Sequence, residues 1–481
     1  MESANKQAAN LLKLEQALSP IIPLLREIGE LFVKAGFEIS LVGGPVRDAL
    51  LGSTVKDLDF TTNARAEDIQ RVLKPWADNI WDVGIKFGTV GAKKGEAELE
   101  ITTYRSEVYD PTSRKPEVNF GNSLIEDLTR RDFTINTIAL TLPDFKIIDA
   151  HNGVDDLINR KLVAPIDPEI LFSEDPLRMM RAARFISKLD LTVDPSILIA
   201  VEKLKNRLEV VSKERISDEF SKLLLLDSPR QGLEFLVKTK LADQFLPELP
   251  ALQLEVDEHH RHKDVYHHSL IVLEQAIALE KSHQPQLAPD LVLRLAALLH
   301  DIGKPRTRKF EAEGRVSFHH HEVVGARMSK KRLHELRFSN EIISDVAKLV
   351  ELHLRFHGYG SGQWTDSAVR RYVRDAGELL TRLHKLTRAD STTRNQRKAD
   401  ELQKNYDQLE KRIDELSQAE ELASIRPDLN GQEIMQILDL PAGPLIGKAY
   451  DFLLELRLDG GPLTKDEAKA QLVTWWQNQQ S

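Results

Sequence analysis

A single change in hydrophobic periodicity divides this chain. Residues 37–165 contain short β-branched runs separated by turn signals, whereas residues from about 170 onward repeat apolar positions at helical spacing. The first pattern predicts an α+β domain, and the second predicts that the rest is all-helical. We therefore expect five segments: an N-terminal helical segment (1–36), an α+β head (37–165), a helical neck (166–250), a histidine-rich helical domain (251–395) and a helical tail (396–481).

Histidine is unevenly distributed, and cysteine is absent. Only His151 precedes position 250, and the other 14 of the 15 histidines lie between His259 and His384. Without cysteine, disulfides, thiol nucleophiles and cysteine-ligated metals are excluded, so any metal must be held by His, Asp or Glu. The distribution predicts two parts with different chemistry.

The net charge of −9 excludes a broadly cationic nucleic-acid coat but allows a local basic groove. No apolar run reaches the roughly 18 residues that a membrane span needs. The first residues also lack a signal-peptide pattern. We therefore expect a cytoplasmic protein that does not associate with membranes.

The segment from Leu41 to Gly52 predicts a strand, a Gly-Gly turn and a helix, an arrangement that offers backbone N–H groups to phosphate. A tight turn with an internal ion pair between Arg47 and Asp48 is the alternative. Asp57 and Asp59 follow, two positions apart in a predicted strand, so both carboxylates should point to one face. This pair would suit Mg²⁺ that bridges nucleotide phosphates.

Two further elements could complete a nucleotide site. The alternation around Glu100 indicates a polar strand face, which could supply a third carboxylate or could simply be solvated. Arg130 and Arg131 precede an apolar run that we expect to be helical. Their guanidinium groups are suited to phosphate, and Asp132 could accept hydrogen bonds from ribose hydroxyls.

A possible base-reading pair follows in the predicted neck. Cytosine and adenine present an amino donor beside a ring-nitrogen acceptor, whereas uracil and guanine present the reverse pattern. Asp175 and Arg178, at i and i+3 of a predicted helix, would supply the complementary acceptor and donor. Arg181 and Arg184 continue the stripe and could hold a triphosphate, or they could form salt bridges on the helix surface.

The ordered motifs GGPVRDALLG, DLD, RRDFTIN, EDPLRMMRAARF and ERISDEF resemble the class II tRNA nucleotidyltransferase family. This family comprises CCA-adding enzymes and related bacterial poly(A) polymerases. The resemblance covers roughly residues 25–250 and implies a polymerase-beta-type head in which Asp57 and Asp59 are metal ligands. It also implies a group of nucleotide-binding residues: Gly44, Arg47, Arg131, Asp175 and Arg178.

The function implied by this resemblance is addition of C, C and A from CTP and ATP to the 3′ end of tRNA, with release of pyrophosphate and with Mg²⁺ as cofactor. The polar stretch 106–128 resembles the flexible loop of enzymes that add all three nucleotides. Two alternatives stay open: poly(A) addition, and nucleotide hydrolysis by a chain whose N-terminal domain only senses nucleotide.

The histidine-rich part contains an ordered H…HD…H…H…D series that resembles the HD family of metal-dependent phosphohydrolases. Independently of that resemblance, an apolar helix that ends before Gly303 should present a histidine and an aspartate together, and Lys304 beside them could meet a phosphate. The site would suit Mn, Ni, Co, Fe or Zn. We expect His384 to lie on a helix surface. The resemblance implies these metal ligands: His268, His300, Asp301, His321, His353 and Asp390.

Overall fold

The computed structural model describes residues 12–55, 57–84, 88–108, 117–121, 123–253, 264–311, 316–356, 365–391, 396–420 and 425–480. The chain divides into two units, Met1–Phe245 and Leu246–Ser481. Among the described helices, none combines the length and apolar character that a membrane crossing requires.

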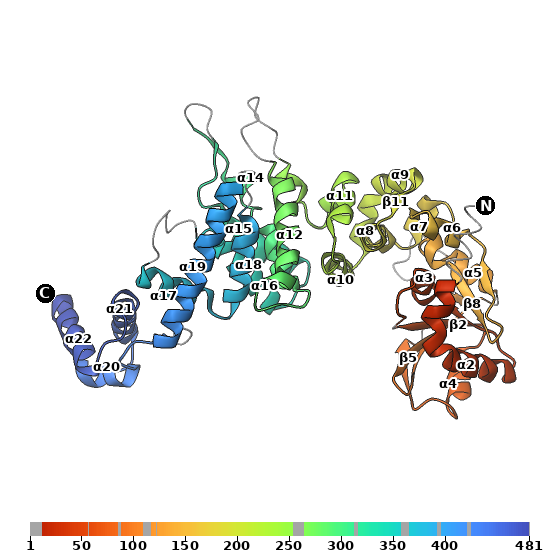
Figure 1. The fold of residues 1–481 in the computed structure, drawn as a ribbon, viewed down its shortest axis with the longest axis horizontal. Coiled ribbons are helices and arrows are strands. Elements are labelled where there is room, and N and C mark those ends of the chain that lie inside the picture. The colour runs from red at the N-terminus through yellow and green to blue at the C-terminus, as the bar shows by residue number, and fades with distance from the viewer. Residues whose placement is uncertain are drawn as a thin grey trace. The chain divides into compact units, whose positions relative to one another are not determined.

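A seven-stranded mixed sheet forms the core of the N-terminal part of the first unit, the red-to-orange region of Figure 1. Its spatial order is β3 (Asn79–Gly84), β4 (Thr89–Lys94), β5 (Ala97–Thr103), β2 (Leu58–Thr62), β1 (Ile39–Val42), β8 (Ile138–Leu142) and β9 (Ile147–Asp149). Strands β2 and β5 are parallel, and the other neighbours are antiparallel. Helix α2 (Ile22–Lys34) packs on β1 and β8, and α4 (Ala66–Leu73) packs on β4 and β5. This unit confirms the predicted α+β head.

The elements that carry the predicted motifs follow the local patterns closely. Helix α3 (Gly44–Leu50) begins directly after the β1 turn, where Gly43 has φ +70°. In β5, Leu99 and Ile101 are buried whereas Glu100 is exposed, so the predicted alternation is correct. Asp57 lies at a bend one residue before β2 rather than within the strand.

Helices dominate the chain from residue 168 to the end of the first unit: α7 (Pro168–Glu174), α8 (Leu177–Leu189), α9 (Pro195–Leu204), α10 (Lys213–Leu224) and α11 (Arg230–Lys238). Helix α8 packs against both α10 and α11. Gly232 is close to α8, because a Cβ there would lie 2.3 Å from the carbonyl oxygen of Ala183.

Two local expectations were wrong. The apolar run after Arg131 is not a helix but a 3-10 turn (η3, Thr134–Asn136) followed by β8. The helix expected through Asp175 is broken there, since Pro176 disfavours helical backbone at the preceding residue. The stretch 106–128 contains the ribbon β6 (Arg105–Val108) and β7 (Glu117–Phe120) and helix α5 (Leu124–Thr129), while residues 109–116 and 122 lie outside the described residues.

Among its described residues, the second unit is helical apart from two short antiparallel strands, β12 (Lys309–Phe310) and β13 (Val316–Ser317). Its first part packs α12 (Val265–Ser282), α13 (Leu291–Leu299), α15 (His321–Glu335), α16 (Asn340–Leu352) and α18 (Leu380–Asp390) around one core. The short helix α14 (Lys304–Thr307) follows α13 after a turn at residues 300–303. Gly303 in this turn lies against the backbone of α15, because a Cβ there would meet the carbonyl oxygen of His321 at 2.1 Å.

The rest of the second unit contains α17 (Asp366–Ala376) and the long helix α19 (Gln396–Glu420), which packs against α17 and α18. Helices α20 (Gly431–Leu438), α21 (Pro444–Gly460) and α22 (Lys465–Gln480) surround a separate apolar cluster. The charged helix predicted near residue 396 and the helical tail are therefore both present.

Candidate functional site

A cavity of about 570 Å³ opens in the first unit, between the sheet, the β1–α3 turn and α8. It brings together residues that are distant in sequence: every predicted nucleotide-site residue except Asp57 lines it. Arg130, expected beside Arg131, lines it as well, and so do two arginines that the sequence analysis did not assign to this site, Arg105 and Arg215.

Acidic side chains gather at the sheet side of this pocket. Asp59 on β2 lies in register with Glu100 on β5, and both line the cavity. Burial raises the pKa of Asp59, and the carboxylates of Glu100 and Asp57 raise it further. A divalent cation would relieve the repulsion within this trio, so the residues present fit a hard metal ion with oxygen ligands.

The Gly-Gly turn brings backbone close to an arginine. A Cβ on Gly43 would lie 3.2 Å from Nη1 of Arg131, and Gly44 beside it begins α3. Arg47 forms the ion pair with Asp48 that was the structural alternative, at 2.7 Å, yet its guanidinium also lines the cavity. The ion pair and a role in the pocket are therefore compatible.

Asp127 holds the arginine pair, and the sequence analysis missed it. This fully buried carboxylate bonds Arg130 at 2.9 Å and Arg131 at 3.1 Å. It also accepts hydrogen bonds from Thr61 Oγ1 on β2 and from the backbone N–H of Arg105. Burial raises the pKa of Asp127, but the two arginines outweigh burial and leave the pKa below its usual value.

The neck contributes Asp175, Arg178, Arg181 and Arg184 to the same cavity, although not from one helix face as expected. Asp175 is the C-cap residue of α7, in extended backbone, whereas the arginines belong to α8. Arg178 donates to the carbonyl oxygens of Leu171 and Arg130, at 3.1 and 2.6 Å.

The remaining pocket groups have partners within the protein. Arg184 pairs with buried Glu219 of α10, and Arg215 contacts Asp175 at 3.2 Å. Asp132, expected to meet ribose, accepts hydrogen bonds from Asn136 and Arg181 inside the protein. These contacts hold the arginines in place around the cavity.

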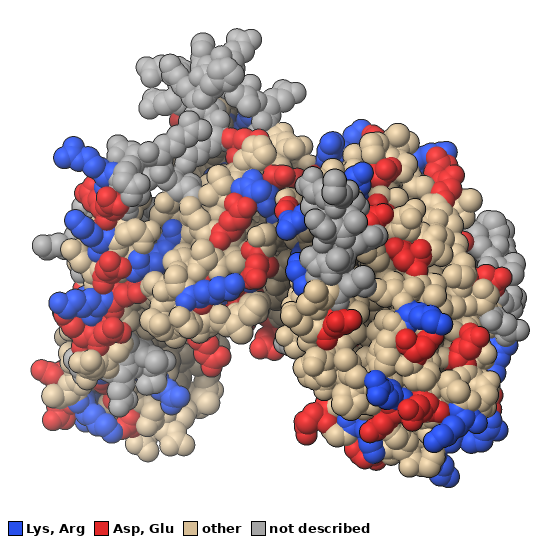
Figure 2. Space-filling view, turned by 45° about the vertical axis from the view of Figure 1, so that its right-hand side comes forward, with Lys and Arg blue, Asp and Glu red and all other residues tan. Residues whose placement is uncertain are grey.

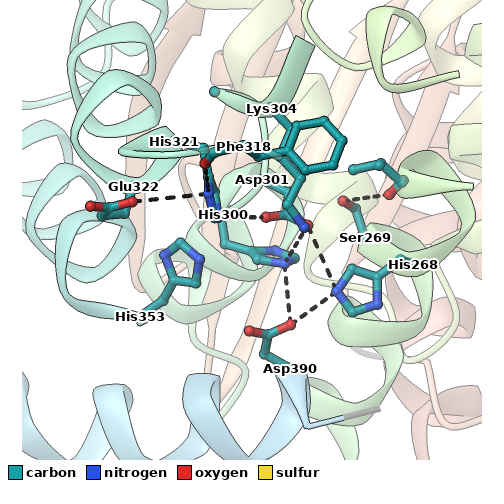
Figure 3. Close-up of polar contacts among 12 residues, drawn as sticks. His268, Ser269, His300, Asp301, Lys304, Phe318, His321, Glu322, His353 and Asp390 are labelled. Atoms are coloured by element: carbon teal, nitrogen blue, oxygen red, sulfur yellow. Dashed lines mark hydrogen bonds and ion pairs between the residues drawn. The ribbon is translucent and has the colours of Figure 1, made fainter. Parts of the chain in front are cut away.

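The six predicted HD ligands lie in one cluster of the second unit, drawn in Figure 3. Their potential ligand atoms form two groups of three, each within 4.8 Å: His268, His300 and Asp390 in one, and Asp301, His321 and His353 in the other. His268 Nε2 is 2.9 Å from Asp390, and His321 Nε2 is 3.2 Å from Asp301.

Three of these imidazoles are fixed in the orientation that metal ligation requires. The Nδ1 atoms of His300, His321 and His353 lie 2.8, 2.8 and 2.6 Å from backbone carbonyl oxygens one helical turn earlier. Their buried Nε2 atoms have no hydrogen-bond partner among the described residues. A ring whose Nδ1–H donates to a carbonyl presents the Nε2 lone pair to a metal. The cluster therefore fits a divalent cation.

The charged groups of the cluster shift one another's pKa values. Burial lowers the pKa of His300, but Asp301 and Asp390 outweigh burial and raise it to about 10. Burial and the charge of His300 lower the pKa of His353 to about 4. Lys304 contacts Asp301 at 2.6 Å, so an ammonium group lies at the cluster as well.

Histidines outside the cluster lie in several different environments. His267, His319, His320 and His334 are exposed. His259, His260, His262 and His357 lie outside the described residues. His384 was expected on a surface but is buried, since its ring stacks on Tyr372 and Nδ1 faces Glu410 of α19.

The face drawn in Figure 2 gives no comparable signal among the described residues. Figure 2 shows acidic and basic side chains intermixed on the face drawn, without one extended patch of either sign among the described residues. The concentration of arginine lies in the cavity instead.

Comparison with protein families matches three consecutive regions. Residues 39–163 match the poly A polymerase head domain, residues 190–252 match a probable RNA and SrmB-binding site of polymerase A, and residues 265–395 match the HD domain. Solved structures share the fold across nearly the whole chain. The CCA-adding enzyme of Bacillus stearothermophilus in complex with CTP covers 96% of this chain and 98% of its own, with a TM-score of 0.66 and 23% identity.

Two relatives differ in how much of the chain they match. The CCA-adding enzyme of Enterococcus faecalis is 41% identical over 248 residues, which are 49% of this chain and 59% of that protein. The A-adding tRNA nucleotidyltransferase of Deinococcus radiodurans is 31% identical over 442 residues, which are 91% of this chain and 95% of that protein. Since that second similarity extends over both proteins almost completely, the chain belongs to the tRNA nucleotidyltransferase family.

Proposed function

We propose that this protein adds C, C and A from CTP and ATP to the 3′ end of tRNA, with release of pyrophosphate. The observation that carries the proposal is the cavity of about 570 Å³, where Asp59 and Glu100 face arginines from the head and neck. A tRNA substrate also agrees with the cytoplasmic location that the sequence predicts.

The carboxylates and the arginines of the site have different roles. Asp57 and Asp59 would hold Mg²⁺, with Glu100 beside them; the cation supplies charge neutralisation at the α-phosphate and a lower pKa for the attacking 3′-hydroxyl. The arginines orient the triphosphate, since bidentate guanidinium contacts fix both position and charge. Arg47, Arg131, Arg181 and Arg184 have this role. Asp175 and Arg178 read the base edge, and Asp132 aligns the arginines.

The product defines the function, so the test uses three tRNA acceptors. They end at the discriminator base, at the first C and at the second C, and each is incubated with labelled CTP, ATP or both. Incorporation of C, C and A in order supports the proposal. A homopolymeric A tail would indicate poly(A) addition, and nucleotide hydrolysis without incorporation would indicate a nucleotide-sensing head.

A narrower activity has one specific observation in its favour. The relative that matches over 95% of its own length is named as an A-adding enzyme, whereas the Enterococcus CCA-adding enzyme matches over 59% of its length. If only the acceptor that already ends in CC is extended, and only by A, this narrower activity replaces CCA addition.

We also propose metal-dependent phosphohydrolysis at the HD cluster. The supporting observation is the set of three buried Nε2 atoms, on His300, His321 and His353, which form no hydrogen bond with the described residues, although two of them lie beside Asp301. A transition metal among Mn, Ni, Co, Fe and Zn suits imidazole and carboxylate ligands. The test is hydrolysis of a phosphomonoester and of a 2′,3′-cyclic phosphate with each metal, and no turnover with any metal would restrict the cluster to a structural role.

A further inference from the structure

A chain of hydrogen bonds crosses the nucleotide cavity from the head to the neck. Arg47 Nη1 on α3 donates to Asn136 Oδ1 at 2.6 Å, and Asn136 Nδ2 donates to Asp132 Oδ1 at 2.8 Å. Arg181 Nε on α8 donates to Asp132 Oδ2 at 2.7 Å. Asn136 thus joins a head arginine to a neck arginine through one carboxylate.

The amide of Asn136 uses both of its polar atoms for this purpose. Its carbonyl oxygen meets a cation, and its NH₂ group meets an anion, so the two partners fix which way the amide points. The side chain is buried and lines the cavity. The charged groups along the connection are Asp48, Arg47, Asp132 and Arg181, and Arg178 also acts on the Asp132 carboxylate. A carboxylate at position 136 would face Asp132, and an alkyl group would release both partners.

An aromatic ring restrains the same two arginines from another side. The guanidinium carbons of Arg47 and Arg181 lie 5.3 and 5.5 Å from the centroid of the Phe185 ring. Phe185 is itself held edge-on against Phe133, with a centroid distance of 5.9 Å. Each arginine therefore has a polar and an aromatic restraint.

We propose that Asn136 is a positioning residue that holds Arg47 and Arg181 at a fixed separation, so that both meet the phosphates of one bound nucleotide. This inference rests on the proposed nucleotidyl transfer. Guanidinium groups in one cavity repel one another, and a long side chain loses conformational entropy when a ligand orders it. The connection through Asn136 offsets both effects before the nucleotide arrives.

The test compares Asn136→Asp and Asn136→Ala with Asn63→Asp in the full-length protein. Asn63 lies outside the cavity, where its Oδ1 accepts from the backbone N–H of Glu38, a contact that aspartate keeps. The measurements are the CTP dissociation constant without tRNA, KM and kcat for incorporation, each across pH, and the thermal midpoint.

We expect Asn136→Ala to weaken CTP binding about tenfold at every pH, because two buried partners lose their hydrogen bonds. Asn136→Asp should be impaired at alkaline pH, where the introduced carboxylate repels Asp132. It should recover at mildly acidic pH, where a shared proton replaces the amide N–H. KM for CTP should rise more than kcat falls, and Asn63→Asp should match the wild type.

Wild-type CTP affinity in both Asn136 variants would overturn the inference. So would a loss that is independent of pH in Asn136→Asp and that falls on kcat and the thermal midpoint alone. If the Asn136 variants do not fold, Phe185→Leu loosens the same arginines, and unchanged CTP affinity in that variant counts equally against the proposal. Wild-type protein that binds CTP but extends no tRNA would refute the proposed function instead, and leaves the CTP-binding comparison valid.

Discussion

The nucleotide cavity and the HD cluster differ in which groups surround their buried aspartates. In the cavity, the arginines are paired with protein carboxylates such as Asp127 and Asp132, while Asp59 faces other carboxylates. In the HD cluster, Asp301 is surrounded by cationic or protonatable groups. Burial raises the pKa of both acids, but His300 and Lys304 reverse the direction at Asp301.

The difference indicates how each site would accommodate a bound cation. Asp59 keeps a raised pKa because burial and the neighbouring carboxylates outweigh the charges of Arg131 and Arg47, so a cation that binds with the substrate would stabilise its charged form. The HD cluster balances its two aspartates with imidazole protons and an ammonium group. A resident metal would take the place of those protons, since a metal ligand must be deprotonated.

The largest expected effect is on the polymerising side. Asp59→Asn keeps the shape of the side chain but removes the charge that holds the cation. Nucleotide incorporation should fall by on the order of 10³-fold or more, while HD phosphohydrolysis stays unchanged. Glu98→Gln, on the exposed part of β5, is the control. Incorporation at the wild-type rate would remove Asp59 from the metal site.

The raised pKa of Asp59 also sets a pH dependence with a defined sign. Because the proton is held more tightly than on an ordinary aspartate, incorporation at low Mg²⁺ should decline from a higher pH as the solution is acidified. Added Mg²⁺ competes with that proton and should move the decline to lower pH. Incorporation rates measured across pH at two Mg²⁺ concentrations check this prediction. A decline at acidic pH that is the same at both Mg²⁺ concentrations would contradict it.

The second-largest effect is expected for the equivalent substitution in the HD cluster. Asp301→Asn removes the carboxylate that lies 3.3 Å from His300 Nε2 and 3.2 Å from His321 Nε2, while Asp390 stays beside His300. Bound metal and phosphohydrolysis should both fall by about 10²-fold or more, whereas CTP incorporation persists. Metal content per protein and both activities are measured, with exposed His319→Gln as the control. Loss of incorporation in Asp301→Asn would show that the two regions are not independent.

Features that depend on residues close together in the sequence were predicted correctly. The alternation in β5 placed Glu100 on the polar face, and the apolar helix α13 ends so that His300 and Asp301 lie together, as expected. The break at Asp175 could also have been read, because Pro176 restricts the backbone before it.

Long-range contacts explain the failures. Asn136 lies 89 residues from Arg47, and Asp127 lies 66 residues from Thr61, so their partners exist only after folding. A polar asparagine inside the run Phe133–Leu142 was the available signal for a buried hydrogen-bonding role. His384 is covered by α19, a contact that helical periodicity within α18 does not reveal.

A third, intermediate effect concerns base choice. Arg178→Ala should reduce discrimination of CTP and ATP against UTP and GTP by about 10- to 100-fold, since the complementary donor is lost. The contacts of Arg178 with Leu171 and Arg130 hold it in the cavity wall, so its removal also tests a structural role. Competition between nucleotides measures selectivity, and Arg160→Ala, an exposed arginine paired with Asp190, is the control. Equal loss for all four nucleotides would make Arg178 structural.

The smallest effect separates two roles of Lys304. Its ammonium group contacts Asp301 Oδ2 at 2.6 Å, where it competes with a metal for that oxygen. Lys304→Met should therefore tighten metal binding about threefold to tenfold, because an opposing positive charge is removed from the site. Phosphohydrolysis should nevertheless fall, since the same ammonium group is a cation beside the cluster that a substrate phosphate can contact. Titration against a chelating dye measures the affinity, and exposed Lys330→Met on α15 is the control. Weaker metal binding in Lys304→Met would instead mean that Lys304 serves to hold Asp301 in position, and the HD cluster would then resemble the cavity, where ion pairs fix the shape of the site.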